Sequence, residues 1–422
     1  MLNNGILQRV FSNESRLLLL FVFIFSINAA AQNNQSKPNQ ASNLQTPRIL
    51  FNQIPTELGL SQNVITCSLQ DRAGFLWFGT KDGLNRFDGY QFKVYQQNPS
   101  DPTSISDSSI TTIFEDTKGR MWIGTENGLN LFDRTHETFY RILPDPNNPN
   151  SLSHHQILYV AEDKQNAIWI GTTSGLNKLE LSNGENPLEN ARFTIFKRDP
   201  AGLENDKVYQ VLTDESGTIY AKLDSGNLFT LTPDTEGKNY VIKLLPVKKD
   251  DYLINICQGR NNKLWLVGNK GIYGFDLKTQ QTVFYPFTPA MLKRSITVVM
   301  QIIEDRNGNI WFGGYWGLAR FSPQNQKIDY FPSNEKDSKE SSLVGYGVNS
   351  ILEDRSGALW FGSNGKGIWR FDRQAERFAH FQEKTSKISL WRGDSVRVLF
   401  ETDDGTLLVG GAAGGVSKFD RE

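Results

Sequence analysis

Cysteine and histidine are scarce in this 422-residue sequence. The two cysteines, Cys67 and Cys257, are too few for the dense disulfide framework that stabilises small exported domains. No pair of histidines has the spacing of a zinc-binding motif. The four histidines are His136, His154, His155 and His380. The sequence therefore predicts no metal site, and we expect no cofactor.

An excess of charge of either sign is also missing. The chain has 45 basic and 46 acidic residues, a formal net charge of −1, and its lysines and arginines are scattered. A nucleic-acid-binding surface would need a basic patch or stripe, so nucleic acid is not an expected partner. The sequence has no G-x-S-x-G nucleophile motif and no phosphate-binding loop. The stretch TDDGT (402–406) resembles a calcium loop but lacks the remaining ligands.

Only one long apolar run is present, the eleven residues 17–27. It is well short of the ~20 residues that a membrane-spanning helix needs. Arg9 and Arg16 precede it, and the small residues 29–31 follow it, as in a cleavable export signal. We therefore expect residues 1–31 to be a signal peptide, with an uncleaved membrane anchor as the alternative. The polar residues 32–47 are expected to be a disordered linker.

The chain does have abundant apolar and aromatic residues, 38% and 12% of the total, and it has repeats. Six similar segments each centre on a tryptophan, and two degenerate copies centre on Tyr220 and Leu408, so that successive anchors are 45 to 51 residues apart. The tryptophan anchors are Trp77, Trp122, Trp169, Trp265, Trp311 and Trp360. Eight copies of this length predict an all-β fold, a β-propeller, over residues 48–422.

Each copy divides into four expected antiparallel strands. An alternating apolar strand leads into an Asp-x-x-Gly turn, and the tryptophan strand and a turn ending in Gly-Leu follow. A third strand precedes a fourth of pattern F-x-x-F/Y, seen at Phe92/Tyr95, Phe193/Phe196 and Phe378/Phe381. We expect each tryptophan to pack between neighbouring blades, and Gly313 to allow close approach of the adjacent blade. The two cysteines are on equivalent strands of repeats 1 and 5, so we expect free, buried thiols.

The number of blades depends on how the ring closes. The segment 48–55 has the position of a fourth strand, and the last repeat ends after a third strand. If the N-terminal strand completes the last blade, the ring has eight blades and no exposed edge. The alternative is a seven-bladed ring, with repeat 8 beginning a second propeller.

The phrases GFLWFGTKDGLNRFDG, MWIGTENGLNLFD and IWIGTTSGLNKLE resemble the two-component regulator propeller repeat. That repeat occurs in periplasmic sensor regions of bacterial hybrid histidine kinases and related diguanylate cyclases. The resemblance, over residues 48–420, implies a periplasmic, non-catalytic sensor of a small extracellular ligand, often a carbohydrate. Such sensors continue through a second propeller, a β-sandwich, a transmembrane helix and an output domain, which this sequence lacks. It is interpreted as a fragment, a disrupted gene product or a stand-alone binding module.

Variable loops on one face of the ring are where we expect a ligand. Exposed aromatic side chains there can stack on a sugar ring, and an arginine can contact a carboxylate. The alternative is that these side chains pack on neighbouring loops. The candidates are His154, His155, Tyr315, Trp316, Tyr346, Trp391 and Arg392.

Three classes of function stay open at this point. The first is ligand sensing, through a homodimer or a membrane sensor partner. The second is a propeller glycosidase or lyase, since paired carboxylates can arise among 46 acidic residues. The third is a propeller that docks a protein. We favour the first, and expect no catalytic residue.

Overall fold

The computed structural model describes most of the chain after residue 50. The described residues are 51–182, 188, 191–196, 207–235, 239–245, 247, 251–292, 298–332, 347–373, 396–402, 404, 406–411 and 415–419. The expected signal peptide and linker lie outside them, as do Phe378 and Phe381.

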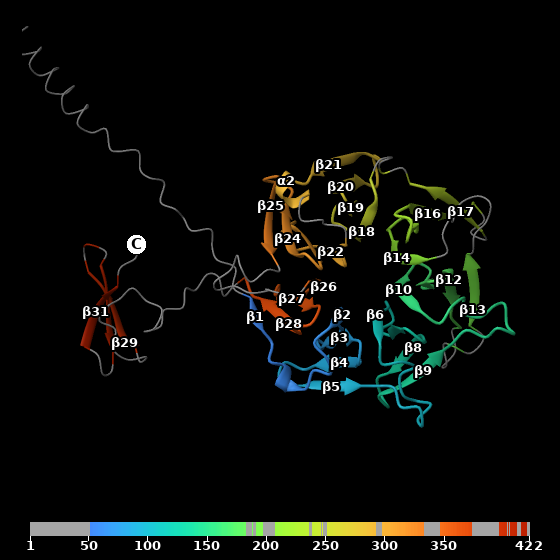
Figure 1. Ribbon diagram of the computed structural model, residues 1–422, viewed down its shortest axis with the longest axis horizontal. Coiled ribbons are helices and arrows are strands. Elements are labelled where there is room, and N and C mark those ends of the chain that lie inside the picture. The colour runs from blue at the N-terminus through green and yellow to red at the C-terminus, as the bar shows by residue number, and fades with distance from the viewer. Residues whose placement is uncertain are drawn as a thin grey trace, which may run out of the picture. The chain divides into compact units, whose positions relative to one another are not determined.

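The described strands form seven four-stranded antiparallel sheets and one three-stranded sheet (Figure 1). There is one sheet for each sequence repeat, which confirms the propeller fold and the count of eight repeats. Blades one to three contain β2 (Ile65–Gln70), β3 (Leu76–Thr80), β4 (Gly83–Phe87) and β5 (Phe92–Tyr95); β6 (Ile110–Glu115), β7 (Met121–Thr125), β8 (Gly128–Asp133) and β9 (Thr138–Ile142); β10 (Ile157–Glu162), β11 (Ile168–Thr172), β12 (Gly175–Glu180) and β13 (Arg192–Phe196).

The remaining blades of the ring follow the same order. Blades four to seven contain β14 (Val208–Thr213), β15 (Ile219–Leu223), β16 (Leu228–Pro233) and β17 (Tyr240–Leu244); β18 (Leu253–Gln258), β19 (Lys263–Gly268), β20 (Gly271–Asp276) and β21 (Thr282–Pro286); β22 (Gln301–Glu304), β23 (Ile310–Gly314), β24 (Gly317–Ser322) and β25 (Lys327–Pro332); β26 (Val348–Glu353), β27 (Leu359–Ser363), β28 (Ile368–Phe371) and β1 (Asn52–Gln53). Two short helical turns are described, η1 (Thr56–Leu58) and α2 (Pro289–Leu292).

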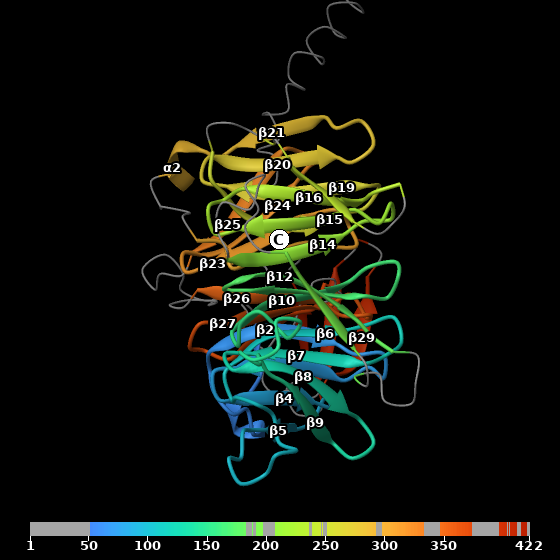
Figure 2. The same cartoon turned by 90° about the vertical axis from the view of Figure 1, so that its right-hand side faces the viewer.

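The first strands of the seven four-stranded blades form a closed circle. Each contacts the first strand of the next blade, from β2 through β6, β10, β14, β18 and β22 to β26, and β26 contacts β2. Figure 2 shows the blades of this ring edge-on, with β21 at one end and β5 and β9 at the other. The ring is therefore complete with seven blades.

Ring closure differs from the eight-bladed arrangement that we expected from the sequence. The N-terminal strand β1 pairs with β28 of the seventh blade, through Asn52↔Arg370 and Gln53↔Trp369. It fills the fourth-strand position that we had assigned to Phe378 and Phe381. The physical reason is aromatic packing, because the Phe51 ring lies 5.5 to 5.8 Å from three phenylalanine rings of blades six and seven. These are Phe331, Phe361 and Phe371.

Arginines on the Asp-x-x-Gly turns also link one blade to the next. Arg306 in blade six donates to the backbone oxygen of Asp354 in blade seven at 2.8 Å. Arg355 in blade seven donates to the backbone oxygens of Asp71 at 2.6 Å and Arg72 at 3.0 Å, in blade one. The same interaction therefore crosses the closing seam, as expected for a seven-bladed ring.

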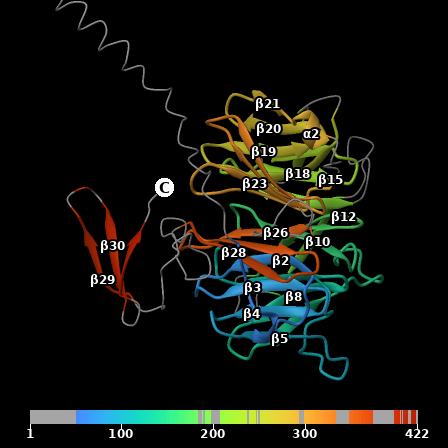
Figure 3. The ribbon, with the colours of Figure 1, turned by 60° about the vertical axis from the view of Figure 1, so that its left-hand side comes forward.

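The eighth repeat folds as a separate sheet of three strands. It contains β29 (Val396–Glu401), β30 (Leu407–Gly411) and β31 (Gly415–Phe419), paired in that order. Figure 3 shows β29 and β30. Among the described residues, no strand of the ring pairs with this sheet. This arrangement corresponds to the sequence-based alternative in which repeat 8 lies outside a seven-bladed ring.

The repeated aspartate and tryptophan form the scaffold of each blade. In five of the six tryptophan repeats the indole N–H donates to the aspartate six residues earlier, as from Trp122 to Asp116 at 2.9 Å. In the fifth repeat Gly259 replaces the aspartate, and Trp265 donates to Glu304 of the next blade at 3.0 Å instead. In the five aspartate-tryptophan pairs both residues are buried, so the carboxylate provides an acceptor for an indole N–H that would otherwise be buried without a partner.

The tryptophans pack across the seams between blades, as predicted. Trp311 of blade six lies 5.7 Å from the Phe361 ring and 6.1 Å from the Phe371 ring, both in blade seven. Gly313 has the predicted close contact, since a Cβ there would lie 2.8 Å from Val348 Cβ. The aspartate, tryptophan and glycine that recur in each repeat therefore stabilise the fold.

Both cysteines are free, and they lie on the first strands of blades one and five. Cys257 is buried, whereas the Cys67 residue as a whole is only partly buried. Burial nevertheless raises the pKa of both thiols. The expectation of two free thiols is confirmed.

Candidate functional site

Two sets of loops meet on one face of the ring, which we call the loop face. One set connects a fourth strand to the next blade, and the other joins the second and third strands. In blade two the Ser106 N–H donates to Asn130 Oδ1 at 2.9 Å, and the Ser106 and Thr125 hydroxyl oxygens are 3.0 Å apart. The same serine, threonine and asparagine contacts recur in blades one and three. These contacts join the two sets of loops, so both lie on the same face.

His154 and His155 lie in the connection between blades two and three. Their rings are stacked, with centroids 4.1 Å apart. His154 Nδ1 accepts a hydrogen bond from the Gln156 N–H at 3.1 Å and lies 2.7 Å from the Thr173 hydroxyl. Burial and the neighbouring His155 lower the pKa of His154, which favours its neutral form. The side chain of His154 thus holds its own loop, and His155 is exposed.

Tyr315 and Trp316 lie in the turn between β23 and β24 of blade six. Tyr315 is 54% exposed, and Trp316 is 8% exposed. The Trp316 indole N–H donates to the Val298 backbone oxygen at 2.9 Å, and its ring stacks on Tyr330 at 5.8 Å. Tyr315 is therefore available on the loop face, whereas Trp316 packs beneath it.

The other three candidates cannot be placed. Tyr346, Trp391 and Arg392 lie outside the described residues. Of the four candidates that are described, His154 and His155 lie together and Tyr315 and Trp316 lie together, in different blades, so these four do not form a single site.

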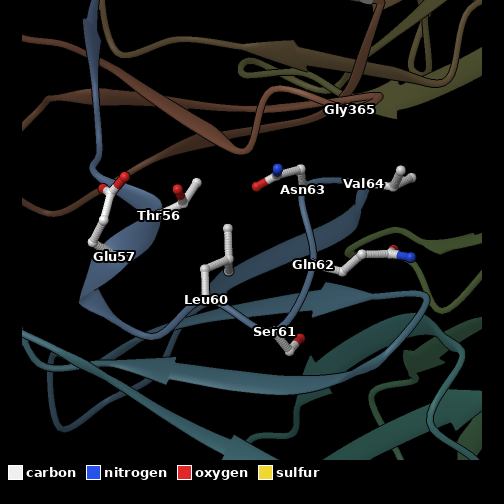
Figure 4. Close-up of a pocket in the computed structure, with 8 residues that line it drawn as sticks. All are labelled: Thr56, Glu57, Leu60, Ser61, Gln62, Asn63, Val64 and Gly365. Atoms are coloured by element: carbon white, nitrogen blue, oxygen red, sulfur yellow. The ribbon is translucent and has the colours of Figure 1, made fainter.

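An open pocket of about 630 Å³ lies on the loop face where the ring closes, and we call it the closure pocket (Figure 4). It separates the segment leading into β2 from the turn between β27 and β28. The lining residues are Thr56, Glu57, Leu60, Ser61, Gln62, Asn63, Val64 and Gly365.

Backbone contacts hold the two walls of the closure pocket together. The Asn63 backbone oxygen accepts from the Gly365 N–H at 3.1 Å and the Gly367 N–H at 2.9 Å. A Cβ at Gly367 would lie 3.5 Å from Thr56 Cγ2 and from Leu60 Cδ2. Gly367 also has φ +71°, a conformation that glycine adopts without strain. Asn63 and Gly365, which are 302 positions apart in sequence, are thus fixed against one another.

The closure pocket offers mixed polar and apolar chemistry. Leu60 and Val64 supply apolar surface, whereas hydroxyl, amide and carboxylate groups surround them, including the exposed Glu57. The Gln62 Oε1 atom is buried and has no hydrogen-bond partner among the described residues. A buried acceptor without a partner costs free energy, which a donor on a ligand would recover.

Sequence reasoning did not identify the closure pocket. The segment that precedes the first repeat differs from the other repeats and could have drawn attention. The turn that faces it, between β27 and β28, could be identified only once the closing blade was known.

Within the described ranges, no group of three or more histidine, cysteine, aspartate or glutamate side chains is arranged to hold a metal ion. None of the described helices has the length and apolar character needed to cross a membrane.

Comparison with known proteins places this fold. Five segments match the sequence model of the two component regulator propeller, namely residues 59–82, 104–127, 151–174, 294–316 and 342–365. Histidine kinase P4 of Formosa agariphila is 48% identical over 62 residues, which are 15% of this chain and 4% of that protein.

Solved structures with the same fold include extracellular domains of two hybrid two-component systems of B. thetaiotaomicron. They match with TM-scores of 0.64 and 0.61, at 19% and 18% identity, over 89% of this chain. The matches cover 54% and 46% of those domains, so this chain spans about half their length. At this identity the likeness concerns the fold. The five matched segments show that the chain contains repeats of the two component regulator propeller type.

Proposed function

We propose that this chain is a non-catalytic, ligand-sensing propeller of a two-component type of signalling protein, exported to the periplasm. Its ligand is a small extracellular molecule, and a carbohydrate fits best. The observation that carries the proposal is the closure pocket, with the unused acceptor of Gln62. The extracellular domains of similar fold support the assignment to sensing.

The lining of the closure pocket favours a polyhydroxylated ligand. A sugar hydroxyl can donate to Gln62 Oε1 once the side chain rotates toward the closure pocket, and the Asn63 amide can both donate to and accept from neighbouring hydroxyls. The apolar face of a sugar ring can pack on Leu60. A fully apolar ligand would leave the Gln62 acceptor unpaired, and a metal ion would lack a cluster of carboxylates.

The position of the closure pocket suggests how binding is transmitted. One wall leads into the first blade and the other belongs to the seventh, so a ligand that contacts both stabilises the closed ring relative to a loosened one. Such a ligand shifts the population toward the closed arrangement by the difference in its affinity for the two states. A homodimer partner or a membrane sensor element would read that shift.

The proposal is tested by binding and turnover together. The chain from Gln32 onward is applied to a glycan array, and each bound glycan is then incubated with it and assayed for cleavage. We expect binding without cleavage. Turnover of a bound glycan would favour a glycosidase or lyase, whereas capture of a protein from periplasmic extract without glycan binding would favour a docking propeller.

Two variants assign binding to the closure pocket. Gln62→Leu removes the unused acceptor and should weaken affinity about 3- to 10-fold, the range for one hydrogen bond. Because Gln62 Oε1 has no partner among the described residues, the variant should fold as the wild type does. Asn147→Ala, an exposed amide in another loop, is the matched control. Equal affinity of all three proteins would show that the ligand binds elsewhere.

A further inference from the structure

A lysine replaces glycine at one position of the fourth repeat. Lys222 in β15 pairs with Gln210 of β14, and the same position is glycine in six of the other seven repeats and Val267 in the fifth. The six glycines are Gly79, Gly124, Gly171, Gly313, Gly362 and Gly410.

Glycine elsewhere has a steric reason. A Cβ at Gly124 would lie 2.7 Å from Ile157 Cγ2 of the next blade, so the seam is closed there. In the fourth blade the longer Lys222 side chain occupies the seam toward blade five and is only 5% exposed. The other repeats form their blades without a lysine at this position, so Lys222 is not needed for the fold of a blade.

Two tyrosines on the loop face hold the lysine. The Lys222 ammonium lies 5.2 Å from the ring centroid of Tyr209 and 5.8 Å from that of Tyr252, both within the range of a cation–π contact. The tyrosines are themselves 39% and 41% exposed. The Tyr252 hydroxyl donates to the Asp224 backbone oxygen, which fixes the orientation of its ring.

Within the part of the chain that the structure describes, the ammonium of Lys222 forms no ion pair, although the Asp224 carboxylate is near enough to raise its pKa. The lysine is 5% exposed, and the two tyrosines beside it are open to solvent. A cation that has lost much of its hydration without gaining a counter-anion favours binding of an anion.

We propose that Lys222, Tyr209 and Tyr252 form a binding site for a carboxylate carried on a ring-shaped ligand, for which a uronic acid is the simplest probe. The carboxylate accepts a charge-assisted hydrogen bond from Lys222, and the exposed faces of the tyrosines pack on the C–H face of the ring. This site lies between blades four and five. It is therefore separate from the closure pocket between blades seven and one.

The test is an NMR titration at pH 7 and low salt with sodium glucuronate and with methyl glucoside, a neutral ring of similar size. We expect glucuronate to bind and methyl glucoside to bind at least about tenfold more weakly, since a hydrogen bond to a charged group is lost. Lys222→Met should weaken glucuronate binding by the same factor. Lys207→Met, which removes an exposed lysine nearby in the sequence, should not.

A variant that is expected to strengthen binding separates loss of the site from misfolding, because a misfolded protein would not bind more tightly. Asp224→Asn removes the carboxylate that competes for the lysine, and it should tighten glucuronate binding several-fold. Equal binding of glucuronate and methyl glucoside, or unchanged affinity in Lys222→Met, would overturn the proposal; so would weaker or unchanged binding by Asp224→Asn. Gln62→Leu should leave glucuronate binding at this site unchanged, so failure here is distinguishable from failure of the closure pocket.

Discussion

Removing the aspartate that supports a blade tryptophan should destabilise the ring strongly. Asp163 in blade three is 5% exposed, and its carboxylate accepts three hydrogen bonds. The donors are the Trp169 indole N–H at 2.7 Å and the backbone N–H groups of Gln165 and Ala167, both at 2.9 Å. Asp163→Ala leaves these donors without a partner, and two of them are buried.

The size of the effect follows from these contacts. A hydrogen bond to a charged group contributes about 1.5–3 kcal/mol, and contributions within one network are not additive. We therefore expect Asp163→Ala to lower the free energy of unfolding by about 3–4 kcal/mol. Urea denaturation followed by circular dichroism measures the change, which should appear in the midpoint and not in the slope.

A double-mutant cycle isolates the central interaction. Trp169→Phe removes the indole N–H, and the double variant should show a coupling free energy of about 1–2 kcal/mol with Asp163→Ala. Asp404→Ala is the matched control, because Asp404 occupies an exposed turn of the three-stranded sheet, and it should leave the midpoint of the ring unchanged. Loss of less than about 1 kcal/mol in Asp163→Ala, or strict additivity in the cycle, would refute the reasoning.

Three further outcomes follow from individual contacts. Gly124→Ala should destabilise the ring by about 1–3 kcal/mol in urea, because the new Cβ would lie 2.7 Å from Ile157 Cγ2; an unchanged midpoint would contradict this. Burial lowers the pKa of Lys222 from 10.5 to about 8, so the unfolded chain binds more protons between these values and stability should rise with pH there. Lys222→Met should accordingly be more stable than wild type by about 1–3 kcal/mol at pH 7, and a stability difference that persists above pH 10 would refute the assignment. Burial raises the pKa of Cys67 to about 12 and raises that of Cys257, so neither thiol should react with a disulfide reagent at pH 8 until urea unfolds the chain; rapid labelling of the native protein would contradict the burial.

Much of the fold could be predicted because the repeat is a local signal. Asp116 and Trp122 are six residues apart, and the same pair recurs in most repeats. Alternating apolar and polar residues, together with turn residues, mark the strands of each repeat. The role of Gly313 was also predictable, since a glycine two residues after five of the six repeat tryptophans indicates close packing. These features depend on neighbours within one blade or on the same contact repeated in every blade.

The candidate site was less predictable, because its residues are distant in sequence. Gln62 and Gly365 share the closure pocket only because blades one and seven meet. Trp316 was chosen as a variable aromatic residue, but its ring packs on Tyr330, which no pattern in the turn itself reveals. Lys222 could have been noticed as a departure from glycine in the repeat alignment. Its two tyrosine neighbours could not, since Tyr252 comes from the next blade.

The sequence by itself determined that the chain forms four-stranded blades around buried tryptophans, because period and turn chemistry act within about 50 residues. The tertiary structure alone decided where the ring closes. Every blade offers an edge that a free strand could pair with, so counting repeats leaves the partner of the N-terminal strand undetermined. The packing of Phe51 against blades six and seven selects the seventh blade, and that choice also creates the closure pocket.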